Sequence, residues 1–131
     1  MKLKWLALAF TIFIIAVIVL ADLGRLRFLL WIVSRVDNLD TFLHFLLIGI
    51  LTFLVSVSLM QSFPTKNLNW IALGSIIFFL IVFTIEEISQ GPIRGRDFSL
   101  KDLAANYAGI LLFGFFAWWR YGRIKKENIS K

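Results

Sequence analysis

Cysteine is absent from this sequence and histidine occurs once, and each scarcity excludes a class of site. Without cysteine there are no disulfides, thiolate-bound metals, thiol nucleophiles or cysteine-linked haems. A single histidine excludes a metal site built from several histidines of one chain. Charged residues are also few, at 17% of 131 residues, against about a quarter in soluble domains. Polar side chains are therefore too scarce to cover a water-soluble globule.

Sequence motifs of several common enzymes are missing as well. The chain has no phosphate-binding Gly-x-x-x-x-Gly-Lys loop, no dinucleotide-binding glycine fingerprint, no Gly-x-Ser-x-Gly elbow and no His-Glu-x-x-His. A basic patch with nucleic-acid geometry is also missing, so the formal charge of +6 points to membrane topology and anionic lipid.

Hydrophobic residues make up 60% of the chain, and they gather in four runs at residues 5–21, 42–60, 68–85 and 103–119. At about 1.5 Å per residue, a helix over each run matches the hydrocarbon thickness of a bilayer. Helices are expected because lipid cannot satisfy an open backbone. The sequence therefore predicts an all-α, polytopic membrane protein, with residues 1–131 forming a single four-helix transmembrane bundle.

The first run has two interpretations. A basic start and the residues Val19-Leu20-Ala21 are typical of a cleaved signal peptide, but its apolar core is longer than the usual ~7–15 residues. We therefore expect a retained helix.

The connection at residues 22–41 places leucines and Val33 on one helical face and polar residues on the other. It is interpreted as a short interfacial helix, with an extended segment as the alternative. Gly91-Pro92 is expected to end the third membrane helix, and Ser99-Leu100-Lys101-Asp102 is typical of a capping box that opens the fourth.

Basic residues near the crossings are slightly more numerous on the side that holds both termini. The positive-inside rule then places both termini in the cytoplasm. An even number of crossings brings the start of the second helix, the end of the third and the start of the fourth to one side of the membrane. Polar side chains concentrate at these three ends: Asp40, His44, Glu86, Glu87, Gln90, Asp102 and Asn106, with Arg94 and Arg96 in the connection.

Side chains four residues apart share a helical face, which pairs Asp40 with His44 and Asp102 with Asn106. Asp40 and His44 are either a pair that tethers two helices or an oriented catalytic base. Glu87 is either a strut to Arg96 or, with Asp102, an acid–base or cation site. One histidine with carboxylates can hold a divalent cation, but no spacing signature marks such a site, so we expect no metal and no cofactor.

The two arginines of the connection, Arg94 and Arg96, are either ordinary headgroup-level charges or a pair that binds a phosphate or carboxylate. Asp102 has a second role available as the acid of the capping box. Ala105 and Gly109 are small enough to let a neighbouring helix approach closely, and Asn106 can then hydrogen-bond across that contact.

Four short motifs in the chain resemble those of the VanZ-like membrane proteins. Asp40-Thr41-Phe42-Leu43-His44-Phe45 resembles their Asp-Lys-x-x-His-Phe, with Thr41 in place of lysine. The other three are Glu87-Ile88-Ser89-Gln90 for Glu-x-x-Gln, residues 96–102 for an arginine, a spacer and Asp102, and Asn106-Tyr107-Ala108-Gly109 for Asn-x-x-Gly. The order and spacing agree from Asp40 to about Gly114, and a contact made by the family's lysine would be missing or supplied by Lys101 or an arginine.

The resemblance implies a bacterial envelope membrane protein, in a family named for an association with resistance to teicoplanin, an antibiotic of the lipoglycopeptide class. It implies no established reaction. The expected localisation is the bacterial cytoplasmic membrane, as a multi-pass protein. The preferred hypothesis is a protein, not an enzyme, that binds an anionic amphiphile at an extracytoplasmic polar cluster: a lipid, a lipid-linked wall precursor or a lipoglycopeptide. One alternative is an enzyme that uses His44 or Glu87 as base on a lipid-linked substrate. Another is a structural or accessory subunit. No nucleic acid is expected as a partner.

Overall fold

The computed structural model describes residues 2–92 and 98–130, and every described element is a helix or a turn. Four helices are long and apolar enough to cross a membrane: α1 (Lys2–Asp22), α3 (Leu39–Ser62), α4 (Leu68–Gln90) and α5 (Leu100–Ser130). A short helix, α2 (Arg27–Ser34), lies between the first two. The predicted all-helical, four-span membrane architecture is confirmed.

The helices are longer than the apolar runs from which they were predicted. The helix α3 starts before residue 42, and α5 continues to Ser130 through the basic tail. Hydropathy detects only the apolar middle of a membrane helix, whereas its backbone hydrogen bonds continue into the polar residues at both ends. The predicted end of α4 holds, because the helix stops at Gln90, directly before Gly91 and Pro92.

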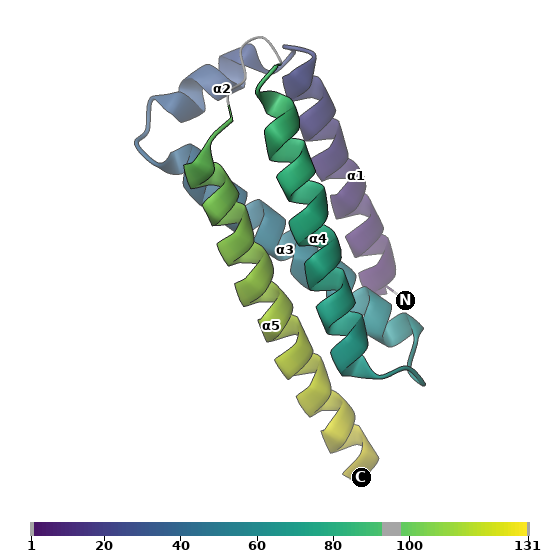
Figure 1. The fold of residues 1–131 in the computed structure, drawn as a ribbon. Helices are drawn as coiled ribbons and strands as arrows, with labels where there is room; N and C mark the ends of the chain where they lie inside the picture. Colours follow the sequence, from purple (N-terminus) through teal and green to yellow (C-terminus); the bar gives the residue numbers. More distant parts are fainter. Residues whose placement is uncertain (1, 93–97, 131) are drawn as a thin grey trace.

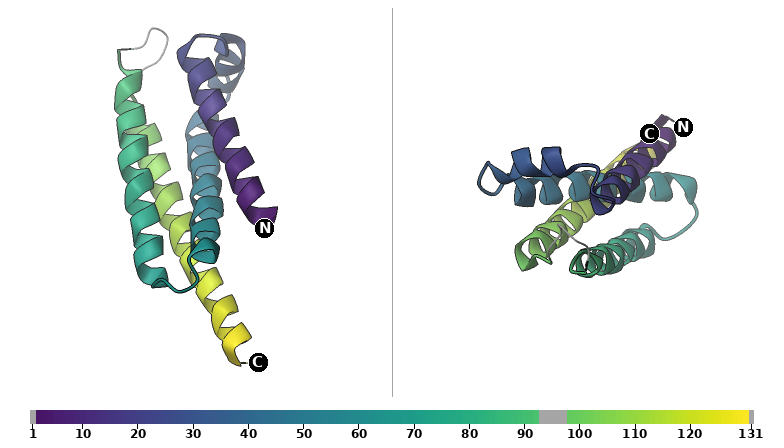
Figure 2. Two further views of the ribbon diagram at one scale, coloured as in Figure 1. Left: turned by 90° about the vertical axis from the view of Figure 1, so that its right-hand side faces the viewer. Right: turned by 90° about the horizontal axis from the view of Figure 1, so that it is seen from above.

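The centre of the bundle is α3, which contacts each of the other four helices and packs most extensively against α5. Figure 1 shows α2 lying crosswise at one end of the bundle, with both chain termini toward the other end. Figure 2 shows the same arrangement from the side and from above. A crosswise amphipathic helix of this kind suits a membrane surface, and the alternative of an extended segment is wrong.

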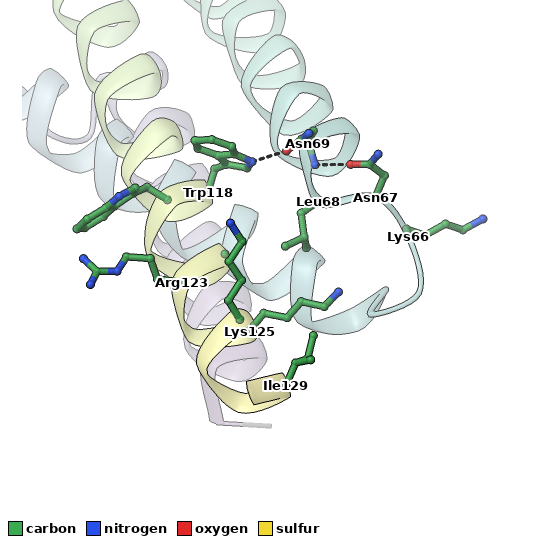
Figure 3. A pocket seen from close by; sticks show the side chains of 11 residues that line it. Lys66, Asn67, Leu68, Asn69, Trp118, Arg123, Lys125 and Ile129 are labelled. Carbon is green, nitrogen blue, oxygen red and sulfur yellow. Dashed lines mark hydrogen bonds between the residues drawn. The ribbon is translucent and has the colours of Figure 1, made fainter. Parts of the chain in front are cut away.

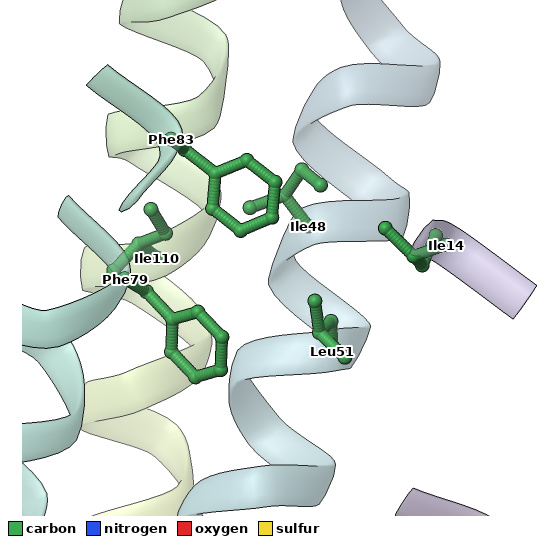
Figure 4. Packing of buried hydrophobic residues seen from close by; sticks show 6 residues of the cluster. All are labelled: Ile14, Ile48, Leu51, Phe79, Phe83 and Ile110. Atoms are coloured by element: carbon green, nitrogen blue, oxygen red, sulfur yellow. The ribbon is translucent and has the colours of Figure 1, made fainter. Parts of the chain in front are cut away.

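The apolar core joins α1, α3, α4 and α5 near the middle of the bundle. Figure 4 shows Ile110 facing the rings of Phe79 and Phe83, with Ile48 beside them. Ile14 of α1 reaches this cluster from the far side of α3. Much of α1 remains exposed, which is expected where lipid covers the helix.

Close approach of α3 and α5 depends on small residues. A methyl group at Gly109 would collide with the carbonyl oxygen of Phe45, and one at Gly49 would collide with the ring of Phe113. At Gly109 and Gly49 the absence of a side chain therefore leaves room for the neighbouring helix. These contacts also hold the first turns of α3 and α5 side by side, which positions the polar residues described next.

Candidate functional site

The polar end of the bundle

Polar side chains from three helices meet at the end of the bundle beside α2. They come from the first turns of α3, the last turns of α4 and the first turns of α5, which lie together in Figure 1. Four of them are buried: Glu87 and Asn106 are fully enclosed, and Gln90 and Asp102 nearly so. The three helix ends lie at one end of the bundle, and their polar side chains make two groups of contacts, one around His44 and one around Glu87.

His44 is the centre of this polar end. Its Nε2 atom lies 3.6 Å from Oδ1 of Asp40 on the same helix and 3.8 Å from Oδ2 of Asp102 on α5. Both separations are longer than a hydrogen bond. Asp40 and His44 lie in close side-chain contact, and the structure adds Asp102 as a second carboxylate beside the imidazole. The Asp40 side chain is 54% exposed and that of His44 21%, so the cluster opens to the surroundings on the Asp40 side.

Asn106 fixes the orientation of the imidazole. The Nδ1 atom of His44 is 3.1 Å from Oδ1 of Asn106. A carboxamide oxygen can only accept, so Nδ1 carries the hydrogen and donates it. In the neutral ring, Nε2 then presents its lone pair to the two carboxylates. The Nδ2 atom of Asn106 is buried and has no hydrogen-bond partner among the described residues.

The side chain of Asp102 is bonded to Thr41 of α3 and does not complete the predicted capping box with Ser99. Thr41 Oγ1 donates to Asp102 Oδ1 over 3.0 Å, which leaves Oδ2 facing His44. The backbone N–H of Asp102 donates to Ser99 Oγ, so one half of the predicted box is present. The other half is replaced, because the N–H of Ser99 donates to Glu87 and not to Asp102.

The side chain of Glu87 is buried and accepts hydrogen bonds. Its Oε1 accepts the Ser99 N–H over 3.1 Å, and Gln90 Nε2 contacts its Oε2 at 3.5 Å. Gln90 also donates to Glu86 over 2.6 Å. Glu87 therefore joins the end of α4 to the start of α5, and its enclosure argues against direct attack on a substrate.

Some predicted residues lie outside the described part of the chain. Arg94 and Arg96 belong to the connection between Pro92 and Phe98, so the proposed anion contacts and the Glu87–Arg96 strut are not described.

At the edge of the polar end, Lys101 Nζ donates to Asn38 Oδ1. Thr41 bonds Asp102 directly, a contact that the sequence did not predict.

Two further surfaces

A groove between α4 and α5 begins one helical turn from the polar end. Leu80, Ile81, Thr84 and Tyr107 line its volume of about 240 Å³. The hydroxyls of Thr84 and Tyr107 hydrogen-bond to each other. Tyr107 follows Asn106 in the chain, so this mostly apolar groove lies near the polar end of the bundle.

A larger cleft of about 660 Å³ lies at the opposite end of the bundle, between the α3–α4 turn and the basic part of α5. Figure 3 shows Trp118 donating to Asn69, with Arg123 and Lys125 beside it. Lys125 also donates to the carbonyl of Pro64 over 3.0 Å. The sequence analysis did not predict that residues at this end line a cleft.

Comparison with known proteins finds no match to any family, to any curated protein or to any solved structure.

Proposed function

We propose that this chain is a VanZ-like integral membrane protein of the bacterial envelope that binds an amphiphile with an anionic head at its polar end. One observation carries the proposal: Glu87 and Asn106 are fully buried among polar side chains at one end of a bundle whose spans are largely apolar. Ionisable and amide groups are unfavourable in a bilayer, so their concentration at one end is the mark of a site.

The shape of the bundle suits an amphiphile. The groove of Leu80, Ile81, Thr84 and Tyr107 is mostly apolar and opens on the α4–α5 face, where an acyl chain can lie. In the sequence, Arg94 and Arg96 lie between Pro92 and Phe98, so they join the two helices that line the groove. Paired guanidinium groups suit a phosphate or carboxylate head.

The test measures binding of fluorescent phosphatidic acid to the purified protein in phosphatidylcholine nanodiscs, with labelled phosphatidylcholine as the zwitterionic probe and teicoplanin as a competitor. The double variant Arg94→Gln, Arg96→Gln removes the proposed head contacts. The matched control, Arg25→Gln with Arg35→Gln, removes two arginines that flank α2 at the same end of the bundle. Charged hydrogen bonds contribute about 1.5–3 kcal/mol each, so we expect at least a tenfold loss for the first variant only.

Equal losses in the two double variants would mean that surface charge alone attracts the probe, and the proposal would be wrong. Displacement by teicoplanin would extend the site to lipoglycopeptides. Equal affinity for both labelled lipids would contradict the proposed preference for an anionic head.

A second candidate is acid–base chemistry on a lipid-linked substrate. The observation in its favour is the position of His44 beside Asp40 and Asp102. The enclosed Glu87 is a poor base, so His44 carries this alternative. Release of inorganic phosphate from phosphatidic acid, lost in His44→Ala while lipid binding persists, would establish it.

A further inference from the structure

We propose that Asp40, His44 and Asp102 bind one divalent transition metal ion at the polar end of the bundle. The proposal does not depend on the amphiphile, because it rests on a different set of atoms. Each residue offers one ligand atom, and these three atoms all lie within 4.8 Å of one another.

The separations fit a shared ion. Zn²⁺ and similar ions bind nitrogen and carboxylate oxygen at about 2.0–2.2 Å, which puts neighbouring ligand atoms roughly 3–3.5 Å apart. The observed 3.6 and 3.8 Å from His44 Nε2 to the two carboxylates exceed this spacing by a few tenths of an ångström. Small side-chain rotations close such a gap.

The orientation of His44 supports the same conclusion. Its Nδ1 hydrogen is directed at Asn106, so the lone pair of Nε2 in the neutral ring faces Asp40 and Asp102. In the neutral ring, this lone pair and the two carboxylate oxygens together suit a cation that lies among them. Metal-bound histidines characteristically donate their second ring hydrogen to an outer partner, which Asn106 provides here.

Asp102 has an outer partner as well. Thr41 donates to Oδ1 and leaves Oδ2 directed at His44. The buried amide of Asn106, with its unpartnered Nδ2, lies directly behind the imidazole. Asp40 is the exposed member and provides the route of entry.

The ligand types indicate the metal. One imidazole with two carboxylates suits Zn²⁺, Mn²⁺ or Co²⁺, whereas a site for Ca²⁺ or Mg²⁺ is built from oxygen alone. Three protein ligands leave at least one position of the ion for water or for an oxygen of a ligand. No spacing motif in the sequence marks this site, because its residues come from two different helices. His44 and Asp102 are 58 positions apart in the chain.

The test uses the purified full chain after treatment with a chelator. Zn²⁺ is added, free metal is removed by dialysis, and bound metal per chain is measured by mass spectrometry, with the affinity taken from titration calorimetry. Co²⁺ provides a visible absorption band that reports an imidazole and carboxylate environment. We expect one equivalent of metal per chain, and a rise in thermal stability with metal concentration.

The variants separate ligation from folding. His44→Gln and Asp102→Asn are expected to lower the affinity at least a hundredfold. The exposed Asp40→Asn makes the smallest demand on packing, and we expect at least a tenfold loss with an unchanged helical spectrum. Asn106→Ala is expected to weaken binding about 10–100-fold as a positioning residue and to shift the Co²⁺ band.

Glu86→Gln is the matched control, because it removes a carboxylate from the same end of the bundle that is not among the proposed ligands. Its metal content and affinity should equal those of the unmodified chain. Failure of the unmodified chain to bind Zn²⁺, Mn²⁺ or Co²⁺ would overturn the proposal, as would equal affinity in Asp40→Asn and Glu86→Gln. Neither result bears on lipid binding, so this proposal and the amphiphile proposal fail separately.

Discussion

The hydroxyl of Thr41 orients the carboxylate of Asp102. Its Oγ1 donates to Oδ1 of Asp102 between α3 and α5, so the other carboxylate oxygen is left facing His44. Threonine is a neutral donor, so this contact orients Asp102 without adding positive charge beside Asp40. The cluster is therefore left favourable for an external cation.

Replacing Thr41 by valine is expected to destabilise the bundle by about 1–2 kcal/mol, because Asp102 loses a donor in a mostly buried setting. Thr41→Ser keeps the donor and should retain most of the stability. The measurement is the free energy of unfolding in mixed micelles. Thr11→Val is the control, since Thr11 bonds only the carbonyl of Ala7 in its own helix. A Thr41→Val chain as stable as Thr11→Val would show that the interhelical bond is unimportant.

At the scale of the helices, the contact between α3 and α5 determines whether the cluster forms. Gly109 lies against the backbone of Phe45, next to His44, so the spacing of the helices at this point sets the distance from His44 to Asp102. A wider spacing would separate the carboxylate from the imidazole without changing either side chain.

Gly109→Ala is therefore expected to cost about 1–3 kcal/mol through overpacking and to weaken metal binding at the same time. Gly74→Ala is a matched change in α4, where nothing lies within 4 Å of the added carbon. It should leave stability unchanged or raise it by up to about 1 kcal/mol, because alanine favours a helix. Thermal unfolding and metal titration of both variants provide the check. Retention of full stability in Gly109→Ala would contradict the close approach.

Across the whole molecule, the four crossings separate two polar boundaries of different character. The end beside α2 holds carboxylates, amides and the imidazole, whereas the end with the chain termini holds the basic and tryptophan-lined cleft. A bound divalent metal would offset the two carboxylates at the first end and make that end more favourable for an anionic head.

The absence of cysteine allows a clean test of orientation. With both termini in the cytoplasm, Asp37→Cys lies outside and Ser130→Cys inside. A membrane-impermeant maleimide should label Asp37→Cys in intact cells and Ser130→Cys only after lysis. The reverse pattern would place the polar end in the cytoplasm, and labelling of both positions in intact cells would contradict an even number of crossings.

The sequence by itself determined the membrane class, the number of long helices and the end of the bundle at which polar residues gather. These follow from local properties: apolar length sets each span, Pro92 stops a helix, and an even number of spans brings three helix ends together. The tertiary structure alone decided which atoms meet. The Asp102 carboxylate faces His44 because Gly109 lets α5 approach the backbone of α3, and the enclosed Glu87 accepts a hydrogen bond from the N–H of Ser99. Such contacts join residues far apart in the chain, and helical periodicity carries no information about the distance between two helices.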